Sequence, residues 1–275
     1  MQRKPIVFPR ILGFLLAAML GGCNSKRPAP SGQPRAVMAL VAASAQDAVN
    51  DLSPRFTADT GVEVHVVADD SGKLAQQIAN GAPAQVFLSA NKKWVDFLAG
   101  KGLIAERTDF LGNSLVIVVP ANGKATVHDP ADLLAPQIAH IALAGPNVPA
   151  GIYGRQALTK LGLLDKLEEQ KKIVSGENVR ATLAYAERGE TEAAIVYSTD
   201  ARISDKVRAV YTFPASTHDP IVYPLVLLMP EAKTADGGSD AGRKFYDFLK
   251  SPAAADAFRR RGFGTPETPD HLPKS

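Results

Sequence analysis

Residues 68–90, which read ADDSGKLAQQIANGAPAQVFLSA, place a helix start directly behind the end of a strand. The preceding run at 62–67 alternates apolar and polar residues and ends in two valines, a pattern typical of a strand. Residues 69–72 are of types that cap helices, and apolar residues follow at helical spacing. Such units predict an α/β protein, in which ligands bind at the carboxyl ends of strands and helix starts favour anions.

The same unit recurs along the chain. Short apolar runs that predict buried strands, each followed by a helix signal, lie at 37–42, 86–88, 141–144 and 194–197. Ser44 follows the first run and is predicted to cap the next helix. The helix predicted at 92–101 turns its aromatic residues Trp94 and Phe97 inward. This alternation predicts mixed sheets flanked by helices.

Two further apolar runs divide the chain into two lobes. We interpret the runs at 115–120 and 222–229 as strands that cross from one lobe to the other and back. The predicted organisation assigns 36–115 and 218–264 to lobe 1, 116–217 to lobe 2, and 265–275 to a polar, proline-rich, disordered tail. A ligand cleft between the two lobes follows from this arrangement.

The N-terminus has the pattern of a secretory signal. Basic residues precede an apolar run at 11–20 that is too short to span a bilayer, and small residues then lead to Cys23, the single cysteine. We expect 1–22 to be a lipoprotein signal peptide, Cys23 to carry a lipid, and 23–35 to be a flexible tether. The mature protein would then be periplasmic or extracytoplasmic and anchored to a membrane. The alternative is an ordinary cleaved signal with an unmodified thiol.

The charge balance argues against several classes of partner. Residues 1–22 carry three basic and no acidic residues, so without them Lys and Arg fall from 31 to 28 and equal the 28 Asp and Glu. A neutral chain has no overall positive field to attract nucleic acid or an anionic membrane surface. The five histidines lack metal-ligand spacing, and no nucleophile motif is present. We therefore expect no enzyme, no cofactor and no nucleic-acid partner, and any anion must be recognised locally.

Six segments, taken in order, carry a family resemblance. They are AAS at 42–44, SGKLAQQI at 71–78, GAPA at 81–84, LGNS at 111–114, VPAGIY at 148–153 and IVY at 195–197. Over residues 37–264 the chain resembles the periplasmic molybdate-binding proteins of ABC transporters. The resemblance implies a two-lobed class II solute-binding fold that closes on a tetrahedral oxyanion. It also implies a monomer that hands molybdate or tungstate to the membrane permease of an importer.

The resemblance further implies a set of oxyanion-binding residues, namely Ser44, Ser71, Ala150, Val179 and Tyr197. In the family pattern the serines bind through hydroxyl and backbone N–H, Ala150 and Val179 through backbone N–H, and Tyr197 through its hydroxyl. All of these donors are neutral. Except for Tyr197, each position also lies where the residue pattern itself places a helix start, with free N–H groups and a partial positive charge.

Asp69 and Asp70 depart from what an anion site needs, because carboxylates directly before Ser71 would repel an oxyanion. We expect both carboxylates to point away from the ligand and to cap the helix. One alternative is a binder of another tetrahedral oxyanion, such as sulfate or phosphate. A second is a dehydratase-like enzyme on the same scaffold, with Asp70 and Tyr197 as candidate acid and base.

Overall fold

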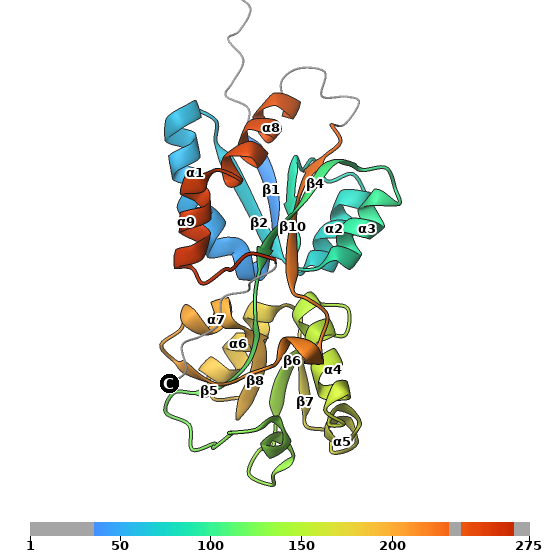
Figure 1. The fold of residues 1–275 in the computed structure, drawn as a ribbon, viewed down its shortest axis with the longest axis vertical. Coiled ribbons are helices and arrows are strands. Elements are labelled where there is room, and N and C mark those ends of the chain that lie inside the picture. Colours follow the sequence, from blue (N-terminus) through green and yellow to red (C-terminus); the bar gives the residue numbers. More distant parts are fainter. Residues whose placement is uncertain (1–35, 231–237, 267–275) are drawn as a thin grey trace, which may run out of the picture. The chain divides into compact units, whose positions relative to one another are not determined.

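The protein is described here by a computed structural model that covers residues 36–230 and 238–266. Within these residues the strands form two five-stranded mixed sheets flanked by helices (Figure 1). The predicted signal peptide 1–22, the lipidation site Cys23 and the tether 23–35 lie outside the described residues, as does most of the predicted tail. None of the described helices is long and apolar enough to cross a membrane.

The first sheet has the strand order β2-β1-β3-β10-β4. Its strands are β1 (Val37–Ala42), β2 (Val64–Asp69), β3 (Val86–Leu88), β4 (Ile104–Gly112) and β10 (Val222–Leu228). β1 runs parallel to β2 and β3, whereas β10 runs antiparallel to β3 and β4. The run predicted at 222–229 therefore does return to the sheet of the N-terminal strands.

Helices cover both faces of this first sheet. One face carries α1 (Gln46–Thr60), α8 (Gly238–Leu249) and α9 (Pro252–Arg260), and the other carries α2 (Ser71–Ala79) and α3 (Lys92–Ala99) (Figure 1). Val41 of β1 packs in the same core cluster as Phe56 of α1. Its neighbour Leu40 packs in a second cluster with Leu74 of α2. Successive side chains of β1 thus face opposite layers, which explains its continuous apolar sequence.

The second sheet repeats this plan in the order β7-β6-β8-β5-β9. Its strands are β5 (Leu115–Pro120), β6 (Ile141–Ala144), β7 (Ile173–Gly176), β8 (Ala193–Tyr197) and β9 (Val207–Thr212). β6 runs parallel to β7 and β8, and β5 runs antiparallel to β8 and β9. We call each sheet with its helices a lobe, the first sheet belonging to lobe 1.

The helices of lobe 2 and the short turns complete the fold. They are α4 (Pro149–Lys160), α5 (Leu164–Glu169), α6 (Val179–Glu187) and α7 (Ser198–Arg202), with 3-10 turns η1 (Ala43–Ala45), η2 (Pro130–Leu134) and η3 (Ala215–Thr217). Both parallel trios of strands send their carboxyl ends into helix starts. The predicted mixed sheets and their strand-to-helix turns are confirmed.

Three local features differ from the sequence prediction. The pattern predicts neither β4 nor β7, because both are edge strands whose residues are largely half-buried or exposed. Phe97 was expected to face inward but is 37% exposed, while Val95 and Leu98 fill the core. Trp94 is half-buried beside Gly72, where a Cβ would lie 2.6 Å from the indole ring. The inward stripe of α3 is therefore aliphatic, and its aromatic residues lie at its margin.

Candidate functional site

A small cavity lies where the carboxyl ends of the parallel strands of both sheets come together. It has about 210 Å³ of empty space, part of which is open to solvent. Its lining comes from the ends of β1, β2, β3, β6, β7 and β8 and the segments that follow them. Its lining residues are Ala42, Ala43, Ser44, Asp69, Asp70, Ser71, Ala90, Val148, Pro149, Ala150, Asn178, Val179 and Tyr197. The structure thus brings together all five residues predicted from the resemblance.

Three helix N-termini offer backbone donors at this cavity. Ser71 and Val179 are the first residues of α2 and α6, and Ala150 is the second residue of α4, as predicted. N–H groups at these positions have no carbonyl partner within the helix. Among the hydrogen bonds of the described residues, none is donated by these three N–H groups. They are therefore free to bind an anion, which the partial positive charge of each helix start favours.

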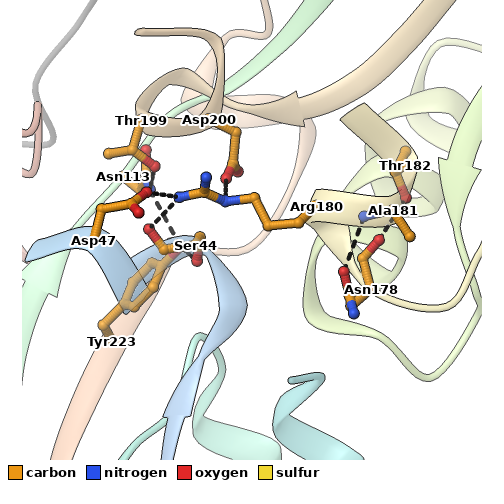
Figure 2. Close-up of polar contacts among 10 residues, drawn as sticks. All are labelled: Ser44, Asp47, Asn113, Asn178, Arg180, Ala181, Thr182, Thr199, Asp200 and Tyr223. Atoms are coloured by element: carbon orange, nitrogen blue, oxygen red, sulfur yellow. Dashed lines mark hydrogen bonds and ion pairs between the residues drawn. The ribbon is translucent and has the colours of Figure 1, made fainter. Parts of the chain in front are cut away.

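Ser44 does not cap a helix, so that prediction is wrong. It lies inside the turn η1, which continues into α1, and it makes no capping hydrogen bond. Its hydroxyl oxygen instead lies 2.7 Å from the hydroxyl oxygen of Tyr223, which accepts a hydrogen bond from the Asn113 side-chain amide at 3.2 Å (Figure 2). Either hydroxyl can be the donor in this pair, because each carries one proton and can also accept. When Tyr223 is the donor, Ser44 can give its hydroxyl proton to a ligand.

The hydroxyls of Ser71 and Tyr197 are also available as donors. The Ser71 oxygen accepts a hydrogen bond from the Ala90 N–H at 3.0 Å, which leaves its proton free. Tyr197 is 1% exposed, and its hydroxyl has no hydrogen-bond partner among the described residues. Burial raises the pKa of Tyr197 well above its ordinary value, so the phenol stays protonated. A buried donor without a partner is costly unless a ligand satisfies it.

Asp70 caps α2 as predicted, and it is also one of the residues that line the cavity. Its Oδ1 accepts a hydrogen bond from the Lys73 N–H at 2.9 Å, whereas its Oδ2 is buried without a partner in the described part of the chain. Burial raises the pKa of Asp70 above its ordinary value, against the opposing effect of the helix N–H groups. The cavity wall therefore contains a buried acidic group as well as its donors.

Asp69 is engaged with other groups. Its Oδ1 accepts hydrogen bonds from the Asp70 N–H at 2.7 Å and from the Asn178 side-chain amide of lobe 2 at 3.1 Å. The Lys73 ammonium lies 3.6 Å from the same oxygen. Because cationic and amide groups surround this carboxylate, it offers less repulsion to an anion than Asp70 does.

Gly151 permits the close approach of α4 to the strand before it. A Cβ atom at this position would collide with the carbonyl oxygens of Ala144 and Gly145. The helix can therefore start directly over the end of β6, which places Ala150 in the cavity wall. Packing therefore explains why the VPAGIY segment has glycine at position 151, since a side chain there would clash with the backbone.

A cluster of charged residues next to the cavity was missed by the sequence analysis. Arg180 of α6 forms ion pairs with Asp47 of α1 at 2.7 Å and with Asp200 of α7 at 2.8 Å (Figure 2). Asp200 is fully buried, and burial raises its pKa to about 6 despite the guanidinium beside it. Local periodicity contains no signal for such a cluster, because its members belong to three separate helices.

The chemistry of the cavity fits a small anion. Its donors are hydroxyl and backbone N–H groups, and its charged lining residues are the two aspartates. No group of three His, Cys, Asp or Glu side chains within 36–230 and 238–266 could hold a metal cation. The arrangement can satisfy several oxygens of one compact ligand from both lobes at once.

Comparison with known proteins agrees with this geometry. The family profile described as bacterial extracellular solute-binding protein matches residues 37–264. The molybdate-binding protein ModA of Escherichia coli K12 is 39% identical over 82% of this chain and 88% of its own length. YvgL of Bacillus subtilis, named as an ABC transporter substrate-binding lipoprotein, is 37% identical over 95% of this chain and 98% of its own length.

Solved structures show the same likeness. The periplasmic molybdate-binding protein of Azotobacter vinelandii superposes with a TM-score of 0.72 and 27% identity, over 86% of this chain and all of that one. A substrate-binding domain of a molybdenum ABC transporter from Clostridium difficile superposes with a TM-score of 0.64 and 30% identity, over 84% and 99% of the two chains. This chain belongs to the bacterial extracellular solute-binding protein family.

Proposed function

We propose that the protein captures molybdate or tungstate outside the cytoplasm and delivers it to the permease of an ABC importer. The names of its relatives support the ligand, and the cavity supports the chemistry. The observation that carries the proposal is the Tyr197 hydroxyl, which is buried without a partner among the described residues in a cavity that Ser44 and Ser71 also line. A tetrahedral oxyanion would accept hydrogen bonds from all three hydroxyls and from the free helix N–H groups.

Neutral donors are sufficient for tight binding of an oxyanion. A hydrogen bond to a charged group contributes roughly 1.5–3 kcal/mol, so five such bonds contribute roughly 8–15 kcal/mol before the costs of desolvation and lobe closure. A micromolar dissociation constant corresponds to about 8 kcal/mol. The donor set therefore needs no Lys or Arg in direct contact with the ligand.

Selectivity would follow from the spacing of the donors. Hydrogen bonds are favourable at heavy-atom distances of about 2.7–3.2 Å and weaken when stretched. Donors on strand ends and helix starts are held at separations set by the two sheets. A site spaced for molybdate would contact the smaller sulfate at longer distances, whereas tungstate, of nearly equal size and charge, would fit as well.

Isothermal titration of the mature protein with molybdate, tungstate, sulfate and phosphate tests the proposal. We expect micromolar or tighter binding of molybdate and tungstate and at least a hundredfold weaker binding of sulfate. Tight sulfate or phosphate binding without molybdate binding would contradict it.

Asp70 favours a second candidate ligand. A buried carboxylate oxygen without a partner can accept a hydrogen bond from an oxyanion that carries a proton, such as hydrogen phosphate. The phosphate titration distinguishes this candidate, since it requires phosphate to bind more tightly than sulfate and molybdate. The alternative of a dehydratase-like enzyme is not retained, because the chain belongs to a family of solute-binding proteins.

We also propose that lipid on Cys23 anchors the mature protein. The alignment with the lipoprotein YvgL covers 95% of the 275 residues, so no more than about 14 residues lie outside it and Cys23 lies inside it. Metabolic labelling with a fatty acid should mark the wild-type protein, and Cys23→Ser should remove the label and release the protein from membranes. A labelled Cys23→Ser variant would contradict the anchor.

The predicted lobe limits and the monomeric state complete the proposal. Lobe 1 takes 36–115 and 218–264 and lobe 2 takes 116–217, joined by two crossings between the sheets. Light scattering of the mature protein after gel filtration should give the mass of one chain, with or without molybdate. A stable dimer would contradict the monomer.

A further inference from the structure

Arg180 makes polar contacts with both lobes. Its Nη2 donates a hydrogen bond to Asp47 Oδ2 at 2.7 Å, and the Ser44 carbonyl oxygen lies 3.5 Å from the same nitrogen. Its Nε lies 2.8 Å from Asp200 Oδ1 (Figure 2). Asp47 belongs to lobe 1, whereas Arg180 and Asp200 belong to lobe 2. One guanidinium therefore connects three helices and both lobes.

Each member of this cluster lies close in sequence to an oxyanion-binding candidate. Arg180 directly follows Val179, Asp47 comes three residues after Ser44, and Asp200 comes three residues after Tyr197. The cluster thus joins the chain segments of three of the five candidates. A small movement of the guanidinium would change the spacing of donors on both sides of the cavity.

The two ion pairs of Arg180 differ in a way that matters for lobe opening. Asp200 is in the same lobe, and its side chain is completely buried, so this pair holds the guanidinium in place within lobe 2. Asp47 is in the other lobe, and its side chain is 38% exposed. Separation of the lobes would break the pair with Asp47 and leave the pair with Asp200 intact.

Arg180 itself is not placed to bind the anion. It is absent from the lining of the cavity, although its neighbour Val179 is part of it. Two carboxylates already use the charge of its guanidinium. Its effect on a ligand must therefore act through the positions of the segments that it joins.

We propose that Arg180 is a positioning residue whose ion pair with Asp47 holds the two lobes closed over the oxyanion and sets the rate of ligand release. This inference rests on the proposed function. The guanidinium side chain is 24% exposed, so water and salt screen this pair less than a surface pair. Loss of a partly buried charge pair is expected mainly to increase the dissociation rate of the ligand.

The chain contains a matched control for this ion pair. Lys73 of lobe 1 and Glu177, next to the start of α6 in lobe 2, form a second pair between the lobes at 3.3 Å. Their side chains are 45% and 71% exposed, so this pair should contribute little. Glu177→Gln removes the same kind of charge contact from the same pair of lobes without touching Arg180.

The single tryptophan provides a readout of closure. Trp94 of lobe 1 donates from Nε1 to the Asn147 carbonyl oxygen of lobe 2 at 3.3 Å, and it lies against Gly72 beside the cavity. Its fluorescence should therefore change when molybdate closes the lobes. Release of radiolabelled molybdate into excess unlabelled molybdate gives the dissociation rate of the same full mature chain.

We expect Asp47→Asn and Arg180→Lys to release molybdate about tenfold faster than the wild type, and Glu177→Gln to stay within twofold of it. The double variant Asp47→Asn/Arg180→Lys should be no faster than Asp47→Asn alone. Because separation of the lobes would break this pair, the unfolding temperature of the open, unliganded Asp47→Asn protein should equal that of the open wild type. If Asp47→Asn lowers the unfolding temperature of the unliganded protein as much as that of the molybdate-bound protein, the pair has a merely structural role and the inference is overturned.

The outcomes separate this inference from the proposed function. A wild-type protein that retains molybdate, together with an Asp47→Asn variant that releases it at the wild-type rate, overturns the role of Arg180 alone. A wild-type protein that binds none of the four oxyanions overturns the proposed function and, with it, this inference. If Asp47→Asn releases molybdate faster and Glu177→Gln keeps the slow wild-type rate, the result supports both the proposed function and the role of Arg180.

Discussion

The hydroxyl oxygen of Ser44 lies 2.7 Å from the hydroxyl oxygen of Tyr223, a residue 179 positions further along the chain. Tyr223 is fully buried on β10, the strand that returns to the first sheet. The contact therefore ties the turn after β1 to the beginning of the strand that returns to the first sheet. It also holds the Ser44 hydroxyl in place beside the cavity that Ser44 lines.

Removal of this contact should weaken ligand binding without unfolding the protein. Tyr223→Phe keeps the buried ring and deletes the oxygen that positions Ser44. We expect the dissociation constant for molybdate to rise about fivefold to tenfold, the equivalent of about 1–1.4 kcal/mol. Titration calorimetry measures the change, with Tyr211→Phe on β9 as the control. An unchanged constant in Tyr223→Phe would show that Ser44 needs no positioning.

Ser71→Ala should remove one direct donor from the ligand. The variant keeps the N–H at the start of α2 but loses a hydroxyl whose oxygen is already held by Ala90. We expect affinity for molybdate to fall by about 1–3 kcal/mol. If calorimetry gives the wild-type constant, Ser71 does not bind the ligand through its hydroxyl.

Asp70→Asn should strengthen binding of a dianion. The amide oxygen can still accept the Lys73 N–H bond that caps α2, while the negative charge in the cavity wall is lost. We expect affinity for molybdate to rise about tenfold, an effect that titration calorimetry would detect. Asp69→Asn serves as the control, because Asp69 is engaged by Lys73 and Asn178. A loss of molybdate binding in Asp70→Asn would instead indicate that the ligand needs the carboxylate.

Asp200 should make stability depend on pH in a defined window. Burial raises its pKa from the ordinary 3.8 to about 6 in the folded protein. The folded state thus holds the proton more tightly, so the contribution of Asp200 is fully present below pH 3.8 and is lost as pH rises through 6. This pKa shift corresponds to a change of about 3 kcal/mol in the free energy of unfolding across that pH window.

Urea unfolding of wild type and Asp200→Asn across this window tests the sign. The free energy of unfolding of the wild type, relative to Asp200→Asn, should decrease between pH 4 and pH 6.5. A relative increase over the same interval would mean that the ion pair with Arg180 outweighs burial and lowers the pKa.

Lys172 should be needed for the stability of lobe 2. It is 8% exposed, and its ammonium group donates to the carbonyl oxygens of Leu133, Leu134, Ala135 and Ile138 at 2.6–3.3 Å. Lys172→Met would leave these carbonyls without their donor, at a cost of about 3 kcal/mol. Urea unfolding measures the loss, and Lys166→Met on the exposed side of α5 should change stability by less than about 0.5 kcal/mol. Equal effects of the two substitutions would contradict this role.

Helix starts and buried strands were accessible from the sequence because both depend on neighbouring residues. Apolar runs such as 37–42 and the capping residues before α2 and α6 act within a few positions of each other. The donor positions Ser71, Ala150 and Val179 follow from these local rules together with the family resemblance. Ser44 lines the same cavity, but it lies inside η1 and not at the helix cap that the local pattern predicts.

Contacts between distant segments were decided only by the tertiary structure. Arg180 meets Asp47 across 133 positions, and Ser44 meets Tyr223 across 179 positions. No periodicity or spacing can predict such pairs, because they depend on how two sheets pack and not on neighbours in the chain. The same reason applies to Asp70. Its residue type predicted a helix cap, but only the packing of α2 left its second oxygen buried with no partner in the described part of the chain.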